Sequence, residues 1–323
     1  MMKFSRAAKL LLALFAFAVA AALAQAETFP NRTIRIIVPY PPGGSIDLTG
    51  RIIGKNLQNS VGQSVVVENK PGANAVIGID ELMRSDPDGH TLIILSDSPV
   101  TINPYLSHVN YDPRSDLVPI SRVVKSPLVL AANAKSGIAS IADLVAAAKA
   151  KPLSMGVSAL GSGSYFAGEL LKRSLGLTMQ AVPYRGGAPA AVAIAAGEVP
   201  LVFTDPAAIL PLIKTGQVVA LGISETERSP AMPGIPTLRE AGVPGFAAGS
   251  WLALFAPRGT QGDRVARLNA EVAKILALPD AQKILLAAGL EPAPNSPAEM
   301  RRIIADDSAK WGELIKATGL KAE

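Results

Sequence analysis

The pattern of apolar and polar positions along the chain predicts strands that alternate with helices. Short apolar runs rich in Val and Ile have the composition of buried strands, and the segments between them carry apolar residues at helical spacing. This alternation is typical of a mostly parallel sheet with helices on its faces. We expect strands at residues 34–38, 64–68, 91–95, 153–157, 180–183, 199–203, 218–223 and 250–256, and an extended segment at 120–132.

The turn after the first predicted strand has the features of an anion-binding site. Pro41, Pro42, Gly43 and Gly44 separate the strand from a helix for which Ser45 is the expected N-cap. Both glycines lack a Cβ, so their N–H groups can approach a ligand closely, and the helix start adds unpaired N–H donors and a partial positive charge. A plain tight turn would use the same residues, and nothing in them chooses between phosphate and carboxylate.

Polar residues also follow several other predicted strands. Because ligands of open α/β sheets bind at the carboxyl ends of the strands, we expect these residues to lie close to the glycine turn. They are Ser96, Asp97 and Ser98 after the third strand, Ser158 with the turn Gly161, Ser162, Gly163, Ser164 and Tyr165, Arg185 after a later strand, and the pair Thr204 and Asp205.

The second half of the chain repeats the arrangement of the first. Strands and helices alternate again after the extended segment, and two C-terminal helices, the last opened by a capping box at Ser296, are expected to pack back on the first half. We therefore predict an α/β fold of two lobes, each a mixed, mostly parallel sheet flanked by helices, with a ligand cleft between them. The first lobe would comprise 27–124 and 249–323 and the second 125–248, with hinge crossings near 120–129 and 250–255.

The N-terminus has the composition of a secretory signal peptide. Lys3, Arg6 and Lys9 precede an apolar run at 10–23, and an A-x-A site ends at residue 26. Removing those three cations from the 31 Lys+Arg leaves 28 against 26 Asp+Glu, a net charge near +2. The chain shows no basic block with interleaved aromatics, so we expect no nucleic-acid partner. With no cysteine there is no disulfide framework, and the apolar core must stabilise the fold.

Enzyme signatures are missing from the sequence. Two histidines and no cysteine offer little for a transition-metal site, and we expect neither a metal nor a cofactor. The segment Gly156-Val157-Ser158 begins like a nucleophile elbow, but Ala159 and Leu160 follow where the final glycine is needed. No P-loop lysine follows a suitable glycine, and no G-x-G-x-x-G follows the first strand. A hydrolase is therefore the least favoured function, and no catalytic residue is assigned.

Ordered motifs extend over essentially all of the mature chain. A PPGG-x-x-D turn falls at 41–47, a GQ-x-V-V-V-EN-x-PGA segment at 62–73 and a DPDG-x-TL segment at 86–92; GSGS and PYRGG follow at 161–164 and 183–187. This order resembles the substrate-binding proteins of tripartite tricarboxylate transporters, the Bug family. The resemblance implies a type II-like periplasmic binding fold, a cleft that closes on a ligand, and delivery to a membrane permease. The family's ligands are mostly small carboxylates, with some amino acids.

The resemblance also implies roles for single residues. Asp47 matches a family aspartate that we interpret as structural, because an acid in the first helical turn would repel an anionic ligand. Many family members have His shortly after GSGS, whereas Tyr165 is the nearest polar aromatic here. Arg185 is either a carboxylate clamp or a solvated surface residue, and Asp205 either meets a ligand amino group or caps a helix. The expected ligand-binding residues are Tyr40, Gly43, Gly44, Ser45, Ser96, Asp97, Ser98, Ser158, Gly161, Ser162, Gly163, Ser164, Tyr165, Arg185, Thr204 and Asp205.

The sequence thus predicts a monomeric periplasmic receptor that delivers a small organic carboxylate to the permease subunits of a tripartite transporter. The paucity of cations in the second lobe favours a mono- or dicarboxylate, aromatic acids included, over a tricarboxylate. A ligand sensor that docks on a signalling partner would use the same fold, and the sequence does not separate the two.

Overall fold

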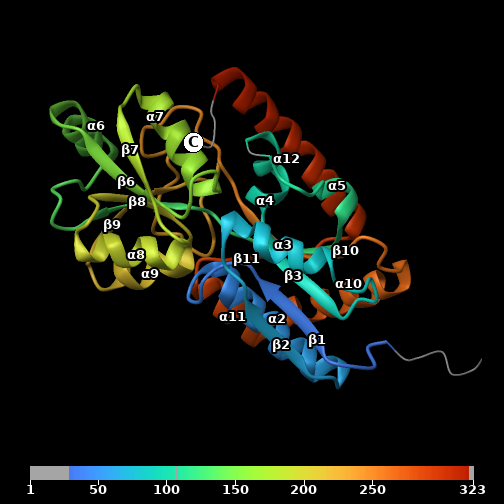
Figure 1. The fold of residues 1–323 in the computed structure, drawn as a ribbon. Coiled ribbons are helices and arrows are strands. Elements are labelled where there is room, and N and C mark those ends of the chain that lie inside the picture. Colours follow the sequence, from blue (N-terminus) through green and yellow to red (C-terminus); the bar gives the residue numbers. More distant parts are fainter. Residues whose placement is uncertain (1–28, 107, 320–323) are drawn as a thin grey trace, which may run out of the picture.

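The computed structural model describes residues 29–106 and 108–319, so the predicted signal peptide lies outside the described residues. Within them the chain folds around two sheets, which form separate lobes on either side of the centre of Figure 1. We call these lobe 1, which carries the first sheet, and lobe 2, which carries the second. None of the described helices is long and apolar enough to cross a membrane.

Lobe 1 contains a six-stranded sheet of order β11-β4-β10-β3-β1-β2. Its strands β1, β2 and β3 are parallel, whereas β10 runs antiparallel between β3 and β4. The strands are β1 (Ile34–Val38), β2 (Val65–Asn69), β3 (Thr91–Ser96), β4 (Leu117–Lys125), β10 (Trp251–Pro257) and β11 (Glu291–Pro292), and the helices are α2 (Ser45–Val61), α3 (Val76–Met83), α4 (Asp97–Thr101), α5 (Pro113–Asp116), α10 (Gly262–Ala277), α11 (Pro279–Ala287) and α12 (Pro297–Thr318).

Lobe 2 contains a five-stranded sheet of order β7-β6-β8-β5-β9, in which β5 is antiparallel to both of its neighbours. The strands are β5 (Val129–Asn133), β6 (Leu153–Val157), β7 (Met179–Pro183), β8 (Leu201–Thr204) and β9 (Val218–Ile223), and the helices are α6 (Ile141–Ala150), α7 (Gly163–Leu175), α8 (Gly187–Ala196) and α9 (Pro206–Lys214). The two mixed sheets with flanking helices confirm the predicted two-lobed α/β class; the predicted domain boundaries in sequence stay predictions.

The chain crosses between the lobes in two segments that lie against each other. The extended segment expected at 120–132 is in fact split, because β4 ends at Lys125 in one sheet and β5 begins at Val129 in the other. The return crossing precedes β10, and the N–H of Ser126 donates to the carbonyl of Ser250 at 2.9 Å. Both crossings thus lie in or next to the segments at which the sequence predicts hinge crossings, and the hinge itself stays a prediction.

Helix α12 joins the cores of both lobes. Met300 and Ile304 in its first half are buried with lobe 1, as expected. Its second half differs from the expectation, because Trp311 and Ile315 belong to the core of lobe 2, and the ring centroids of Trp311 and Phe166 are 6.2 Å apart. In Figure 1, α12 is the long red helix beside both lobes. The C-terminal helix therefore belongs to both lobes rather than to lobe 1 alone.

Candidate functional site

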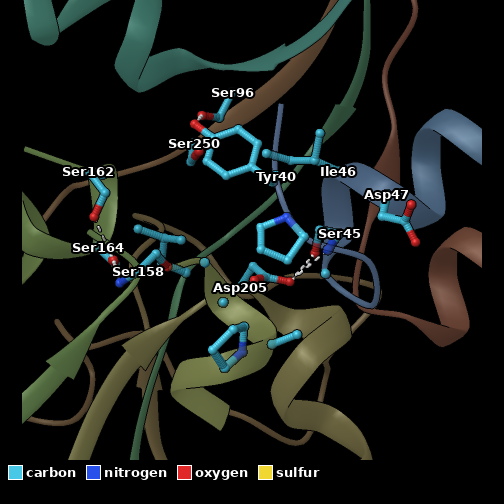
Figure 2. A pocket seen from close by; sticks show the side chains of 18 of the residues that line it. Tyr40, Ser45, Ile46, Asp47, Ser96, Ser158, Ser162, Ser164, Asp205 and Ser250 are labelled. Atoms are coloured by element: carbon cyan, nitrogen blue, oxygen red, sulfur yellow. Dashed lines mark hydrogen bonds between the residues drawn. The ribbon is translucent and has the colours of Figure 1, made fainter. Parts of the chain in front are cut away.

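A cavity of about 70 Å³ lies between the lobes, at the carboxyl ends of β1, β3, β6 and β8. Serine hydroxyls and two helix starts surround it from both sides (Figure 2). We call it the inner cavity; its lining is Tyr40, Pro41, Gly44, Ser45, Ile46, Asp47, Ser96, Asp97, Leu128, Ser158, Ser162, Gly163, Ser164, Gly186, Gly187, Ala188, Pro189, Asp205 and Ser250.

The glycine turn is fixed by Asp47. Gly43 has a φ of +96°, a left-handed conformation that favours glycine, and its N–H donates to the Asp47 carboxylate at 3.1 Å. Arg51 Nε and Asn69 Nδ2 donate to the same carboxylate at 3.0 and 2.9 Å. Burial acts to raise the pKa of Asp47, but these hydrogen bonds lower it below its usual range. Figure 2 shows this carboxylate turned away from the serines, so the structural role expected for Asp47 is confirmed.

The start of α2 is bonded to a carboxylate from the other lobe. Asp205 Oδ1 accepts hydrogen bonds from the Ser45 N–H at 2.8 Å and from Ser45 Oγ at 2.7 Å (Figure 2). The N-cap is Gly44, so the expectation that Ser45 caps α2 is wrong: its hydroxyl serves the contact between lobes instead. Asp205 is itself the N-cap of α9 and accepts from the Ala208 N–H at 3.3 Å. The anionic group at the start of α2 is therefore a side chain of the protein itself, the Asp205 carboxylate.

Lobe 2 presents the start of α7 to the same cavity. Ser162 is the N-cap and accepts from the Tyr165 N–H at 3.2 Å, so α7 begins at Gly163, within the GSGS turn. Ser164 Oγ accepts from the Ser158 N–H at 2.9 Å and lies 2.9 Å from Ser162 Oγ. These bonds hold the two hydroxyls of the GSGS turn on the lobe 2 side of the cavity wall.

Asp97 is a buried carboxyl on the lobe 1 wall. Its side chain is 2% exposed, and Ser250 Oγ donates to its Oδ1 at 2.6 Å. Burial raises the pKa of Asp97 to about 7; the Ser250 hydrogen bond opposes this rise, and the nearby charge of Asp307 adds to it. A carboxyl of this kind takes up a proton near neutral pH and then becomes a hydrogen-bond donor.

We expect Asp97→Asn to stabilise the protein at pH 8 and to do so less at pH 4. Because the pKa of Asp97 lies above its unfolded value, its protonated form favours folding below the unfolded pKa, and that contribution is lost as the pH rises to about 7. The advantage of the variant should therefore grow between pH 4 and 8 by on the order of 4 kcal/mol, since each unit of pKa difference corresponds to about 1.4 kcal/mol. Urea unfolding of both proteins across this pH range measures it; a pH-independent difference would contradict the raised pKa.

The inner cavity contains carboxyl groups but no basic side chain. Of its three aspartates, only Asp47 is paired with a cation, Arg51, whereas Asp97 and Asp205 accept from serines. No cluster of three or more His, Cys, Asp or Glu that could hold a metal ion occurs among residues 29–106 and 108–319. The cavity is therefore suited to hydrogen bonding by N–H groups and hydroxyls rather than by paired charges.

Further hydrogen bonds join the lobes beside the cavity. Ser98 Oγ donates to the Gly161 carbonyl at 2.8 Å, and Asn74 Nδ2 reaches the same carbonyl at 3.2 Å. The Ala207 N–H donates to Ser45 Oγ at 3.3 Å. The lobes are therefore closed on one another in this structure.

Most of the predicted site residues meet at this place. Arg185 instead lies at an outer chamber next to the inner cavity, and Tyr40 and Ser158 border both. Five predicted residues line neither space. The Gly43 N–H donates to the Asp47 carboxylate, and the Ser98 hydroxyl donates to the Gly161 carbonyl. The Tyr165 ring packs edge-on against Phe166, and the hydroxyl of the fully buried Thr204 donates to the Gly187 carbonyl.

Sequence reasoning missed Ser250 and the glycines after Arg185. Ser250 precedes β10, and because β10 is antiparallel to β3, its amino end lies beside the carboxyl end of β3. A rule that considers only the carboxyl ends of parallel strands cannot identify Ser250 as a site residue. The one sequence feature that could have indicated it is a serine placed directly before a buried apolar run. Gly186 and Gly187 begin α8, and the PYRGG motif contained them.

The fold and the cavity define a two-lobed α/β solute-binding protein. Residues 49–320 match the family described as "Tripartite tricarboxylate transporter family receptor". BugT of Bordetella pertussis is 37% identical over 305 residues, which is 93% of this chain and 94% of that protein. The chain therefore belongs to the receptor family of the tripartite tricarboxylate transporters, and the predicted family and general function are confirmed.

Solved structures agree with this assignment. Rpa4515 of R. palustris, described with adipate, is 33% identical with a TM-score of 0.87, and the match covers 91% of this chain and 99% of that one. MatC of Rhodopseudomonas palustris, described with bound malate, is 30% identical with a TM-score of 0.84, covering 89% and 100%. The periplasmic binding protein BugD is 28% identical with a TM-score of 0.86, covering 91% and 100%. These neighbours are binding proteins, which agrees with a non-enzymatic role.

Proposed function

We propose that this protein captures a small organic carboxylate in the periplasm and delivers it to the permease subunits of a tripartite tricarboxylate transporter. One observation carries the proposal: the starts of α2 and α7, which come from opposite lobes, open onto one cavity without a basic side chain. Helix N-termini bind anions through N–H groups and the helix dipole. The adipate and malate of the two R. palustris neighbours belong to the same ligand class.

Binding is coupled to closure of the lobes. A carboxylate bonded to both helix starts makes all of its contacts only when the lobes are closed, so it favours the closed arrangement by its differential affinity. Serine hydroxyls and ordered water can supply the remaining hydrogen bonds. Protonated Asp97 would add an O–H donor and remove a repulsive charge, since its pKa is about 7.

The other parts of the proposal follow from the sequence and the family. Residues 1–26 act as a signal peptide that directs the chain to the periplasm, and the mature protein begins at Glu27 and works as a monomer. The site binds its ligand without changing it, and neither a cofactor nor a metal takes part.

The proposal is tested by a thermal-shift screen of the mature chain against organic acids and the amides of the same acids. A ligand at one hundred times its Kd adds about 2.7 kcal/mol to the free energy of unfolding, which raises Tm measurably. We expect stabilisation by carboxylates and none by their amides. Equal stabilisation by acids and amides, or by uncharged compounds alone, would refute a site for carboxylates.

A further inference from the structure

The inner cavity is too small for most organic acids. Its volume is about 70 Å³, less than half that of a protein cavity of about 150 Å³ that binds benzene. A carboxylate with one or two neighbouring atoms fits such a space, but a longer acid does not. The remainder of a larger ligand must therefore lie in a space that adjoins the inner cavity.

An outer chamber of about 490 Å³ adjoins the inner cavity, and both lobes contribute to it. The two spaces share Tyr40, Pro41, Ser158 and Gly186 as walls. Apolar atoms dominate the rest of the outer chamber, where three prolines, Pro39, Pro41 and Pro71, lie on the lobe 1 side. The chamber can therefore accept the carbon chain or ring of an acid whose carboxylate lies further in.

Arg185 supplies the one basic side chain among the residues that line either space. No carboxylate of the described residues pairs with its exposed guanidinium. Its backbone is nevertheless fixed, because the N–H of Tyr184 donates to the Val157 carbonyl at 2.9 Å and that of Gly186 to the Ser158 carbonyl at 2.8 Å. An arginine held on a firm backbone, with no carboxylate partner among residues 29–106 and 108–319, is suited to a carboxylate from outside.

The lobe 1 wall of the outer chamber is strained and tied to lobe 2. Ala73, Asn74 and Ala75 have φ values of +46°, +47° and +76°, which L-residues with a Cβ rarely adopt. Asn74 donates to the Gly161 carbonyl of lobe 2 and, at 2.8 Å, to Asn103 Oδ1. Strain of this kind gathers at ligand clamps, where surrounding contacts hold it in place. The outer chamber thus has a shaped wall on its lobe 1 side, which is complete only when the lobes are closed.

From these observations we infer that Arg185 forms a second subsite, in the outer chamber, that selects dicarboxylates among the acids that enter the inner cavity. One carboxylate lies in the inner cavity, the apolar spacer lies against the prolines of the outer chamber, and the second carboxylate binds the Arg185 guanidinium. This inference rests on the proposed function, because it assumes that the first carboxylate enters the inner cavity. Arg185 then selects among acids: it distinguishes a long or aromatic dicarboxylate from a monocarboxylate of the same length.

Titration calorimetry of the mature chain tests the inference with three sets of compounds: straight-chain monocarboxylates, dicarboxylates of matched length, and the monomethyl esters of those dicarboxylates. In the wild type, we expect the best dicarboxylate to bind at least roughly tenfold more tightly than its monomethyl ester, because the ester cannot form the charge-assisted pair. Arg185→Gln should remove this difference while changing monocarboxylate affinity less than about twofold. Arg185→Lys should keep part of it, since a lysine retains the charge but not the two-pronged geometry.

Arg239→Gln is the matched control, because it removes the same charge from an exposed position of lobe 2 that lines neither space. It should leave all affinities unchanged. If Arg185→Gln weakens monocarboxylates and dicarboxylates equally, or changes neither, the second subsite is refuted and the proposed function stands. If no carboxylate of any set binds the wild type, the proposed function itself fails and the subsite with it.

Discussion

Replacing Asp205 by asparagine is expected to strengthen carboxylate binding by roughly tenfold or more. A ligand carboxylate that approaches Ser45 must displace the Asp205 carboxylate, which holds the Ser45 N–H and hydroxyl at 2.8 and 2.7 Å, and it also meets the negative charge of Asp205. Hydrogen bonds to a charged acceptor are about twice as strong as neutral ones, and a difference of about 1.4 kcal/mol is one factor of ten in affinity. Calorimetry with the best acid from the screen measures the effect.

The control for this variant is Asp112→Asn. Asp112 is also an N-cap aspartate, accepting from the Arg114 N–H at 3.0 Å, but it lies exposed at the start of α5 in lobe 1. The control should leave ligand affinity unchanged. Loss of binding in Asp205→Asn would reverse the interpretation and show that Asp205 contacts the ligand directly, as it would contact an amino group.

A second large effect is expected from Gly187→Ala. A Cβ at Gly187 would lie 1.7 Å from Asp205 Oδ2 and 2.9 Å from Thr204 Oγ1, so the Asp205 side chain would have to leave its place. Asp205 would then lose its bonds to Ser45 and its cap on α9 together. We expect a loss of about 1–3 kcal/mol in the free energy of unfolding, the usual cost of overpacking, measured by urea denaturation.

Two variants separate this collision from other effects of an added methyl group. Gly44→Ala points a Cβ at the same carboxylate from the other lobe, but at 3.6 Å, an ordinary contact, and should cost little. In the double variant Asp205→Ala with Gly187→Ala the collision partner is gone, so the double variant should be clearly more stable than the sum of the single losses predicts. Additive losses would show that the collision with Asp205 is not the cause.

Much of the fold could be predicted because its signals are local. The bounds expected for β1, β6 and β9 agree with the structure residue for residue, because an apolar run between turns contains all the information needed. The capping box at Ser296 was equally visible. By contrast, α4 and α11 are short or lack a distinctive start, and neither was expected.

The site was less predictable because its decisive contacts join distant residues. Strand-end polar residues identified the inner cavity in outline, since parallel topology brings those ends together. Ser45 and Asp205 are 160 residues apart, and no local pattern indicates that a carboxylate of lobe 2 binds the start of α2. The burial that raises the pKa of Asp97 depends in the same way on the packing of β10 and α12, far along the chain.

The position of β10 in lobe 1 has a consequence for how the protein folds. β10 lies between β3 and β4, yet it follows every strand of lobe 2 in the chain. During synthesis the chain leaves the ribosome amino-terminus first, so all strands of lobe 2 are available before β10 is. Until β10 arrives, β3 and β4 lack the neighbour that lies between them, and an apolar sheet edge stays uncovered. Joining β3 to β10 also closes a long loop, which is a slow step in folding. We expect the sheet of lobe 2 to become protease-resistant first during refolding, before α12 completes the core of that lobe. Lobe 1, and hence ligand binding, should appear only after β10 inserts.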